Sequence, residues 1–585
     1  MQRIVDPRQN SLFDPYSPVL NERARRHLER DWPGVFRHVI LELMPVDALA
    51  GHFHPTMGRP TKELYSMAGL LLLSEWMNWT KPQAVEAYCF HMNVQYALNL
   101  EPVAQALSKR TLERYLCLFE KDNLAQRVLR EVTGRLVEVL GLRIEQQRLD
   151  STHIFSDMAC LGRTRLMGVA VKRFLTQVKR HDPRAYAALE ETLRQRYAPS
   201  THRLFAEVGK GAGGCRRLRQ QVAEDMYALV RQFGEQPEHA KRPSYKAMER
   251  VFYEQCDVEE EAVVVKAKTG GDVMQNPSDP DASYDGHKGP GYQVQLSETC
   301  HADNEQQLIV ATVPQTAAEP DMASLEPVLE VLEAEALLPE ELLVDRQYTC
   351  DDNIQTAEAQ GVELVGPAAG AQPVQQEDDL SIDDFVVDEQ SEEVTCCPNG
   401  HEPTSSVHHS KTGRTKTRMA AEACDGCPCR DQCPVRRGRD GYRLVHTAKQ
   451  RRSDARRREQ ATGVFRKRYR LRAGIEGTHS GLKRCTGLGR LRVRGRPRVF
   501  MAIYLKITGW NLLRASVCAA MRTYVAEKVK TALCALVNAL KSLRDLGRSL
   551  LKAFRSQCVR AFQHPAPTPI HTTAPHQDFC RWHLV

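Results

Sequence analysis

The residues with the clearest chemical meaning lie in the stretch 469–483, YRLRAGIEGTHSGLK. Tyr469, Arg472, Glu476 and Lys483 follow one another there at intervals of 3, 4 and 7 residues. On one helix of about 3.6 residues per turn, these side chains fall on or near one face. A carboxylate between two cations suits a site that holds a divalent metal and contacts phosphate oxygens. An exposed helix with ordinary ion pairs has the same spacing, so Glu476 alone does not distinguish a metal site from a surface helix.

The charge around this stretch is strongly one-sided. Residues 449–498 contain 18 Lys and Arg residues against Asp454, Glu459 and Glu476, a local charge of +15. Because the whole chain carries +8, the remainder is close to −7. A basic block this concentrated predicts a polyanion-binding surface, although a solvated, disordered basic linker would have the same composition.

The pattern Tyr-x2-Arg-x3-Glu-x6-Lys resembles the signature around the third acidic residue of bacterial insertion-sequence DDE transposases, which have an RNase H-like core. The resemblance implies two further catalytic aspartates upstream, each on a β-strand. Asp150 lies in a short strand pattern at 147–154, and Asp345 follows the apolar run at 341–344. We rank Asp157 below Asp150 because it lies beyond the strand-like run.

The elements around Asp345 support this interpretation. The order is β–β–α–β–α–β, with strands expected at 292–296, 307–313, 341–344 and 362–365 and helices at 321–336 and 350–360. This order predicts a mixed sheet with crossover helices, similar to the RNase H-like core. Asp345 then stands at the carboxyl end of a buried parallel strand, where such sheets bind ligands.

The first 140 residues predict a helical region. Helices are expected at 61–78, after Thr80 with Gln83 completing a capping box, from about Ser108, and at 124–141. The helix after Ser108 carries Lys109, Arg110 and Arg114, which suits a helix-turn-helix-like DNA-binding head or a simple packing unit. The resemblance implies that this region engages the ends of the mobile element.

Residues 163–265 predict a helical insertion, with long charged helices at 186–197 and 244–259. The glycine-rich stretch 209–217 lacks the order of a phosphate-binding loop, so no nucleotide site is predicted. Polar residues in the following turn-rich stretch lie near the core in sequence but receive no role, namely Asp281, Asp285, His287 and Lys288.

A cysteine-rich segment follows an acidic linker or exposed hairpin at 368–395. Its short spacings predict a tetrahedral structural zinc site built from Cys397 (or Cys396) with Cys424, Cys427 and Cys433. Cys429 and His401 lie close enough in sequence to leave the ligand set open, and free thiols in a surface loop are the alternative.

We therefore expect an α/β fold in five parts. These are a helical N-terminal DNA-binding region at 1–140, an RNase H-like catalytic core at 141–367, an acidic linker and cysteine-rich insertion at 368–448, a basic catalytic segment at 449–520, and a C-terminal helix with a loose tail at 521–585. Amphipathic helices at 500–520 and 525–554 would pack on the core and help self-association. No secretory signal or membrane span is predicted, and the cysteines suggest reduced thiols in a bacterial cytoplasm.

The resemblance implies metal-dependent DNA cleavage at the ends of an insertion sequence and strand transfer into target DNA. Asp150, Asp345 and Glu476 would hold two Mg²⁺ (or Mn²⁺) ions. Arg472 and Lys483 would position phosphates, and Tyr469 would stack on or hydrogen-bond to the DNA. The partners would be double-stranded DNA and further copies of the chain. The alternatives are an RNase H-like nuclease without strand transfer and a non-catalytic, zinc-bearing DNA-binding protein.

Overall fold

A computed structural model describes residues 1–8, 14–206, 212–370 and 379–562. The predicted tail at 563–585, the start of the glycine-rich stretch and part of the acidic linker lie outside these residues. The chain divides into two compact units, the first ending at Val525 and the second beginning at Ala526. Within the described ranges, no helix is both long and apolar enough to cross a membrane.

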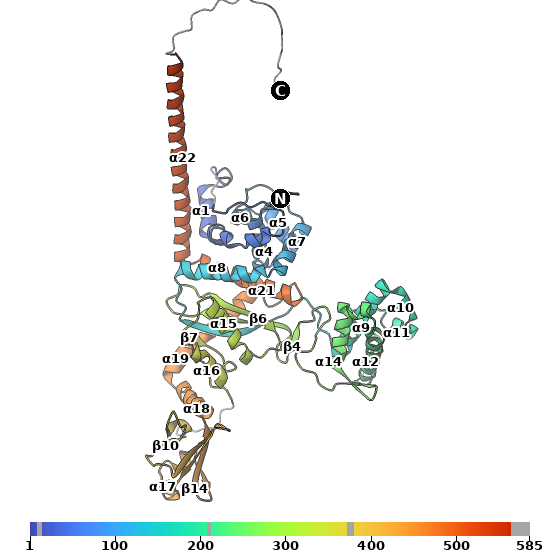
Figure 1. Ribbon diagram of the computed structural model, residues 1–585, viewed down its shortest axis with the longest axis vertical. Helices are drawn as coiled ribbons and strands as arrows, with labels where there is room; N and C mark the ends of the chain where they lie inside the picture. The colour runs from blue at the N-terminus through green and yellow to red at the C-terminus, as the bar shows by residue number, and fades with distance from the viewer. Residues whose placement is uncertain (9–13, 207–211, 371–378, 563–585) are drawn as a thin grey trace, which may run out of the picture. The chain divides into compact units, whose positions relative to one another are not determined.

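The first unit is built around one mixed sheet (Figure 1). Its strands are β1 (Gln146–Ile154), β4 (Ser283–Asp285), β5 (Gly289–Thr299), β6 (Ile309–Thr316), β7 (Glu341–Leu343) and β8 (Glu363–Val365). They are ordered β4-β5-β1-β7-β8, and β6 also pairs with β5. β1 runs antiparallel to β5 and parallel to β7, which is parallel to β8. The predicted mixed sheet is therefore present.

Each face of the sheet carries its own apolar core. On one face, α15 (Leu325–Ala334) packs Val328, Leu329 and Leu332 against a cluster that includes Leu149 of β1 and Leu342 of β7. α16 (Asp351–Ala359) joins the same cluster. On the other face, Ile154 of β1 packs with residues of α21 (Arg496–Ser516). Because side chains alternate along a strand, Asp150 faces the same side as Ile154.

The N-terminal helices form as the sequence predicts, with shorter bounds. They include α4 (Leu64–Trp76), α5 (Lys81–Phe90), α6 (Met92–Ala97), α7 (Lys109–Lys121) and α8 (Leu124–Leu140). The capping box at Thr80 is present, with the Thr80 N–H donating to Gln83 Oε1 at 2.8 Å. Asn511 of α21 donates to Thr133 of α8 and to the Ile309 carbonyl, which links α8 and α21 to the sheet.

The helical insertion has its own apolar core and contains α9 (Arg163–His181), α12 (Ala212–Gly234) and α14 (Pro243–Gln255). Two predicted helices were wrong in extent. The one at 186–197 is split into α10 (Pro183–Ala188) and α11 (Glu191–Arg196), because Leu189 takes an extended backbone conformation. The one at 244–259 ends at Gln255, where β2 (Cys256–Glu259) begins a hairpin with the valine-rich β3 (Ala262–Val265).

The cysteine-rich segment contains a small antiparallel sheet. Its strands are β11 (Ser405–His409), β12 (Arg414–Met419), β13 (Arg436–Gly438) and β14 (Gly441–Thr447), in the order β11-β12-β14-β13. The described end of the acidic stretch pairs β9 (Val386–Val387) with β10 (Val394–Cys396), so this part is a hairpin.

The basic block is mainly helical, but its signature does not lie on one helix as the spacing suggested. It contains α18 (Ala448–Gln460), α19 (Gly463–Tyr469), a 3₁₀ turn (Arg470–Ala473) and α20 (Gly474–Thr486). Tyr469 therefore ends one helix, Arg472 lies in the turn, and α20 carries Glu476 and Lys483. α22 (Ala519–Phe562) extends from the end of the first unit through the second.

Candidate active site

Three separate elements supply the predicted catalytic acids. Asp150 lies in the middle of β1 rather than at its exit, and Asp345 follows the end of β7 by two residues. β1 and β7 are neighbouring parallel strands, which brings these two positions to the same part of the sheet. Glu476 lies in the first turn of α20, which packs on the same face of the sheet as Asp150 points to.

The guanidinium group of Arg472 lies among all three acids. Its Nη2 is 3.2 Å from Asp150 Oδ2 and 4.0 Å from Asp345 Oδ2, and its Nη1 is 3.9 Å from Glu476 Oε1. The side chains of Asp150, Asp345 and Glu476 are 17%, 31% and 73% exposed, so the cluster opens from a buried carboxylate toward solvent. Residues more than three hundred positions apart thus meet at one spot.

The electrostatics of Asp150 suit a cation-binding carboxylate. Burial raises the pKa of Asp150 to about 6, while Arg472 and the Ser151 backbone N–H lower it, and Asp345 and Asp321 raise it further. The crowded carboxylates thus oppose each other's ionisation, and a divalent cation would relieve this. An all-oxygen donor set is the kind preferred by Mg²⁺ and Mn²⁺, so the residue types fit such an ion. In the described structure Arg472 lies between the acids, and no three of their oxygens come within 4.8 Å of one another.

Asp321 is a fourth acid at this site, and the sequence did not reveal it. It accepts hydrogen bonds from Ser151 Oγ at 3.2 Å and from Gln295 Nε2 at 2.9 Å. Gln295 in turn accepts from the hydroxyl of Tyr348, which is fully buried. Burial and the nearby acids Asp321, Asp150 and Asp345 hold the pKa of Tyr348 well above its usual value. The available signal was the buried polar pattern of β5, in which Gln293, Gln295 and Ser297 alternate.

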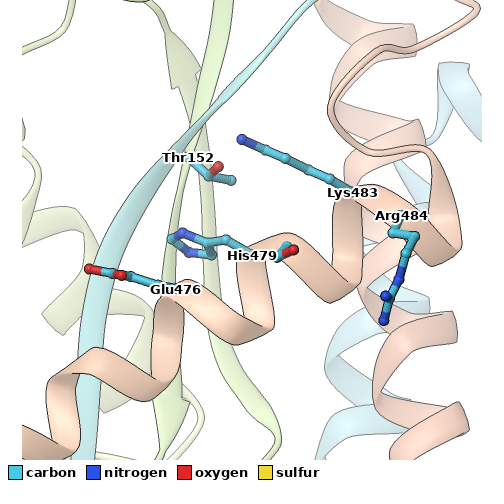
Figure 2. Close-up of a pocket in the computed structure, with 6 residues that line it drawn as sticks. Thr152, Glu476, His479, Lys483 and Arg484 are labelled. Atoms are coloured by element: carbon cyan, nitrogen blue, oxygen red, sulfur yellow. The ribbon is translucent and has the colours of Figure 1, made fainter.

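Beside the acids, an open groove of about 620 Å³ is lined by Thr152 and by one side of α20, namely Glu476, His479, Ser480, Lys483 and Arg484. Figure 2 shows the Lys483 amine reaching toward Thr152, whereas Arg484 points away from it. Burial lowers the pKa of Lys483, and so does Lys288. Lys288, which had no assigned role, donates to Ser151 Oγ at 3.4 Å. The groove is therefore cationic at one end and acidic at the other.

His479 is a second residue that the sequence did not single out. Its Nδ1 is 4.0 Å from Asp150 Oδ2, and its buried Nε2 has no hydrogen-bond partner among the residues described. Burial lowers the pKa of His479 to about 4, helped by Lys483, Arg472 and Lys288. A neutral imidazole thus lies between the acid cluster and the groove.

Other predicted site residues lie in more ordinary surroundings. Tyr469 is half-buried and stacks on Phe465, with ring centroids 5.6 Å apart. Asp157 is exposed, and its backbone N–H donates to the Val493 carbonyl. In α7, Lys109 and Arg110 are exposed, and Arg114 lies 5.0 Å from the ring centroid of Phe53. A DNA contact by these three cations stays a prediction.

The four predicted zinc ligands belong to one small segment, but no three of their sulfur atoms lie within 4.8 Å of one another. The group at that distance among the described residues is Asp182, Glu238 and His239. Cys397 packs against both small apolar clusters of this segment, one of which it shares with Cys433 and the other with Cys424. Burial raises the pKa of Cys424 to about 11, and Cys433, Cys397 and Cys427 raise it further. Crowded thiols that oppose each other's ionisation fit a zinc ion, which would favour their thiolate forms.

Much of the basic block is neutralised internally, which corrects the prediction that all of it faces a polyanion. In α18, four arginines pair with acids, namely Arg451 with Glu392, Arg452 with Asp351, Arg457 with Asp454, and Arg458 with Asp383 and Asp384. Arg498 also pairs with Glu120, so the block contains both neutralised cations and cations without a carboxylate partner among the described residues, including Lys483, Arg490, Arg492 and Arg494.

Residues 396–515 match the family model described as a transposase DDE domain. The matched span includes Glu476 and the cysteine-rich segment but neither Asp150 nor Asp345. No curated protein and no solved structure matches the chain. The predicted resemblance to DDE transposases is thereby confirmed, and the protein carries a transposase DDE domain. The match supports a transposase-type function in general.

Proposed function

We propose that this protein is a metal-dependent DDE transposase that cleaves DNA at the ends of an insertion sequence and joins the freed 3′-hydroxyls to target DNA. The observation that carries the proposal is the meeting of Asp150, Asp345 and Glu476 around Arg472, beside a groove lined by Lys483. The matched domain supports the reaction class, and the geometry supports the residues.

In this proposal Asp150, Asp345 and Glu476 hold two Mg²⁺ (or Mn²⁺) ions. When bound, such ions activate the attacking water or 3′-hydroxyl and stabilise the leaving oxygen of an in-line displacement. Arg472 provides the counter-charge that keeps the carboxylates together in the described structure. For Arg472 to contact a phosphate, as predicted, its guanidinium group would have to leave the carboxylates and pair with the DNA instead.

The chain's own residues then bind and orient the DNA. Lys483 and Lys288 would each place a positive charge beside the acids, where a phosphate could accept hydrogen bonds from their amines. His479, neutral and unprotonated at Nε2 or Nδ1, offers a hydrogen bond without adding charge next to Asp150. Tyr469 would contact the DNA through the edge of its ring, because its face already stacks on Phe465.

We also propose a structural zinc ion held by Cys397, Cys424, Cys427 and Cys433. The segment's apolar clusters are small, so it has little core of its own. A metal that binds only the folded form would supply the missing stability. Removal of zinc by a chelator should unfold this segment, which would be measured as a loss of its β-sheet signal. The sheet that carries Asp150 should stay folded.

Self-association is the third part of the proposal, through residues 526–555 of α22. Apolar residues recur there at alternating steps of three and four, namely Val529, Leu533, Leu536, Leu540, Leu543, Leu550 and Phe554, with Gly547 in the remaining position. Most of these side chains are exposed. A repeat averaging 3.5 residues is the pattern of a coiled-coil seam, so a second copy of the same helix is the matching occupant.

The decisive experiment is a strand-transfer assay on DNA that carries the element's own ends, read from the sequence flanking the gene. The wild type should cleave and join, while Asp150→Asn should lose both activities by about 10³-fold and still bind DNA. Asp157→Asn is the matched control, because that exposed acid lies outside the cluster. Cleavage without joining would favour the nuclease alternative, and equal activity of Asp150→Asn would overturn the assignment.

A further inference from the structure

A row of three exposed arginines follows α20. Arg490, Arg492 and Arg494 occupy alternate positions in the segment GRLRVRG. Backbone hydrogen bonds pin this segment beside the continuation of β1. The Phe155 N–H donates to the Gly489 carbonyl at 3.1 Å, the Leu491 N–H to the Phe155 carbonyl at 2.8 Å, and the Asp157 N–H to the Val493 carbonyl at 2.8 Å.

The backbone pairing fixes which way the side chains point. Leu491 is 3% exposed, and Val493 packs against the same apolar cluster, which includes Ile154 and Ile503. Arg490, Arg492 and Arg494 are exposed, so the three arginines face solvent while Leu491 and Val493 pack inward. The backbone hydrogen bonds to Phe155 and Asp157 hold the segment in place, so the three arginines stay near one another on the surface.

These charges are not neutralised internally. Across the described ranges, no carboxylate lies within ion-pair distance of Arg490, Arg492 or Arg494, whereas α18 pairs four of its arginines. Another cation is close instead, because Arg494 contributes to the lowered pKa of Arg173 on α9, after the larger effect of burial. Arg173 donates to Ser278 Oγ, so it is held in place. Like charges fixed side by side without acids favour a bound anion.

The row lies between the catalytic groove and the helical insertion. At its start, a Cβ placed on Gly489 would come within 3.2 Å of Lys483 Cγ, so the segment begins against a residue that lines the groove. At its end, Arg173 lines two further grooves of about 370 Å³ each on the insertion. Their other cationic lining residues are Lys172, Lys241, Arg242, Lys246 and Arg250.

We infer that Arg490, Arg492, Arg494 and Arg173 form a phosphate-binding row that leads one DNA strand from the catalytic groove onto the helical insertion. The inference rests on the proposed function in that DNA is the polyanion. The arginines of the row would contact backbone phosphates, so their contribution to DNA affinity should not depend on the base sequence. The insertion thus becomes part of the DNA-binding surface.

The test uses the full-length chain and a fluorescent duplex of arbitrary sequence, with binding measured by anisotropy between about 50 and 200 mM NaCl. Each lost phosphate contact lowers the slope of log affinity against log salt by about 0.9. For Arg490→Gln/Arg492→Gln/Arg494→Gln, the slope should fall by about 2.7. The wild type should therefore lose about 40-fold more affinity than this variant across that salt range.

Three further variants sharpen the result. Replacing the same arginines by lysine keeps the charge and should keep the slope. Arg173→Gln should lower it by about 0.9. Arg458→Gln removes an arginine that is already paired on α18, and should leave the slope unchanged. Melting temperatures of all variants exclude unfolding as the cause of weaker binding.

The inference is overturned if the triple glutamine variant keeps the wild-type slope, or if Arg458→Gln lowers the slope as much per residue as the row does. Either outcome leaves the catalytic proposal intact, because Asp150→Asn is tested separately by cleavage and joining. Failure of the proposed function has a different signature, namely a wild-type protein that binds no DNA or performs no metal-dependent cleavage.

Discussion

The helix α18 and the arginine row Arg490, Arg492 and Arg494 belong to the same basic block in the sequence but have opposite environments. Three of the four paired arginines of α18 reach acids that lie far away in the chain, for example Arg452 with Asp351 across 101 residues, while Arg457 pairs within the helix. The row arginines meet no acid within the described ranges. Charge density therefore indicates where cations are, whereas the surrounding fold decides whether they remain available to a ligand.

Arg472 is an intermediate case between these two regions, because it is paired with carboxylates that themselves form the candidate active site. The largest effect is expected from Arg472→Gln, which leaves clustered carboxylates without a counter-charge. Without divalent ions, the free energy of unfolding should fall by about 2 kcal/mol, since the site is only partly buried. Mg²⁺ should recover part of this loss, measured by denaturant unfolding with and without the ion.

Arg492→Gln is the matched control, because it removes an equal charge that has no carboxylate partner. Its stability should be close to that of the wild type at every Mg²⁺ concentration. If Mg²⁺ stabilises neither the wild type nor Arg472→Gln, the acids around Arg472 are not a cation site, and the comparison between paired and catalytic arginines fails.

The second effect in size concerns the internal pairing of α18. Arg452 Nε donates to Asp351 Oδ1 at 2.9 Å and Nη2 to Oδ2 at 2.7 Å, a bidentate pair on a mostly buried carboxylate. A double-mutant cycle with Arg452→Gln and Asp351→Asn should give a coupling energy of about 1.5 kcal/mol. The salt dependence of DNA binding should not change. Additive effects in the cycle would show that the pair is not structural.

The strands could be predicted from the sequence because their signals are local, whereas the resemblance to DDE transposases singled out Asp150 and Asp345 on them. The apolar run before Asp345 predicts a buried strand, and the strand pattern around Asp150 matches β1 closely. Asp321 and His479 could not be predicted, because their place in the site depends on Gln295 and on the packing of α20. The alternation of polar residues along β5 indicates a polar environment but does not identify Asp321 or His479 as part of the site.

The same reason explains why the sequence could not predict which cations of the basic block are paired with acids. Composition counts Arg452 and Arg492 equally, and only the fold brings Asp351 to one of them. The break in the signature helix is likewise tertiary, because the turn at Arg470–Ala473 places Arg472 against β1 and β7. The Leu491 and Val493 alternation did carry a local signal, which becomes informative once their pairing with β1 is known.

A smaller effect is expected from pH. Arg452 lowers the pKa of Asp351 below its ordinary value, more than burial raises it. A carboxyl with a depressed folded-state pKa contributes stability above its unfolded pKa and loses it as pH falls through the folded pKa. The stability difference between wild type and Asp351→Asn should be constant above about pH 5 and shrink below about pH 4. Urea unfolding across this range measures it. In the Arg452→Gln background, this pH dependence should be much weaker.

The smallest effect distinguishes a paired arginine from an unpaired one most directly. Arg458 is 47% exposed and pairs with Asp383 and Asp384, so Arg458→Gln should cost only about 0.5 kcal/mol of stability, and less at high salt. Arg492→Gln should cost almost none but lower the salt slope of DNA binding, which Arg458→Gln should not. We therefore expect Arg458→Gln to change stability but not the salt slope of DNA binding, and Arg492→Gln to change the salt slope but not stability. If instead Arg458→Gln changed the DNA slope, its ion pairs would open to the DNA, and internal pairing would no longer separate structural arginines from ligand-binding ones.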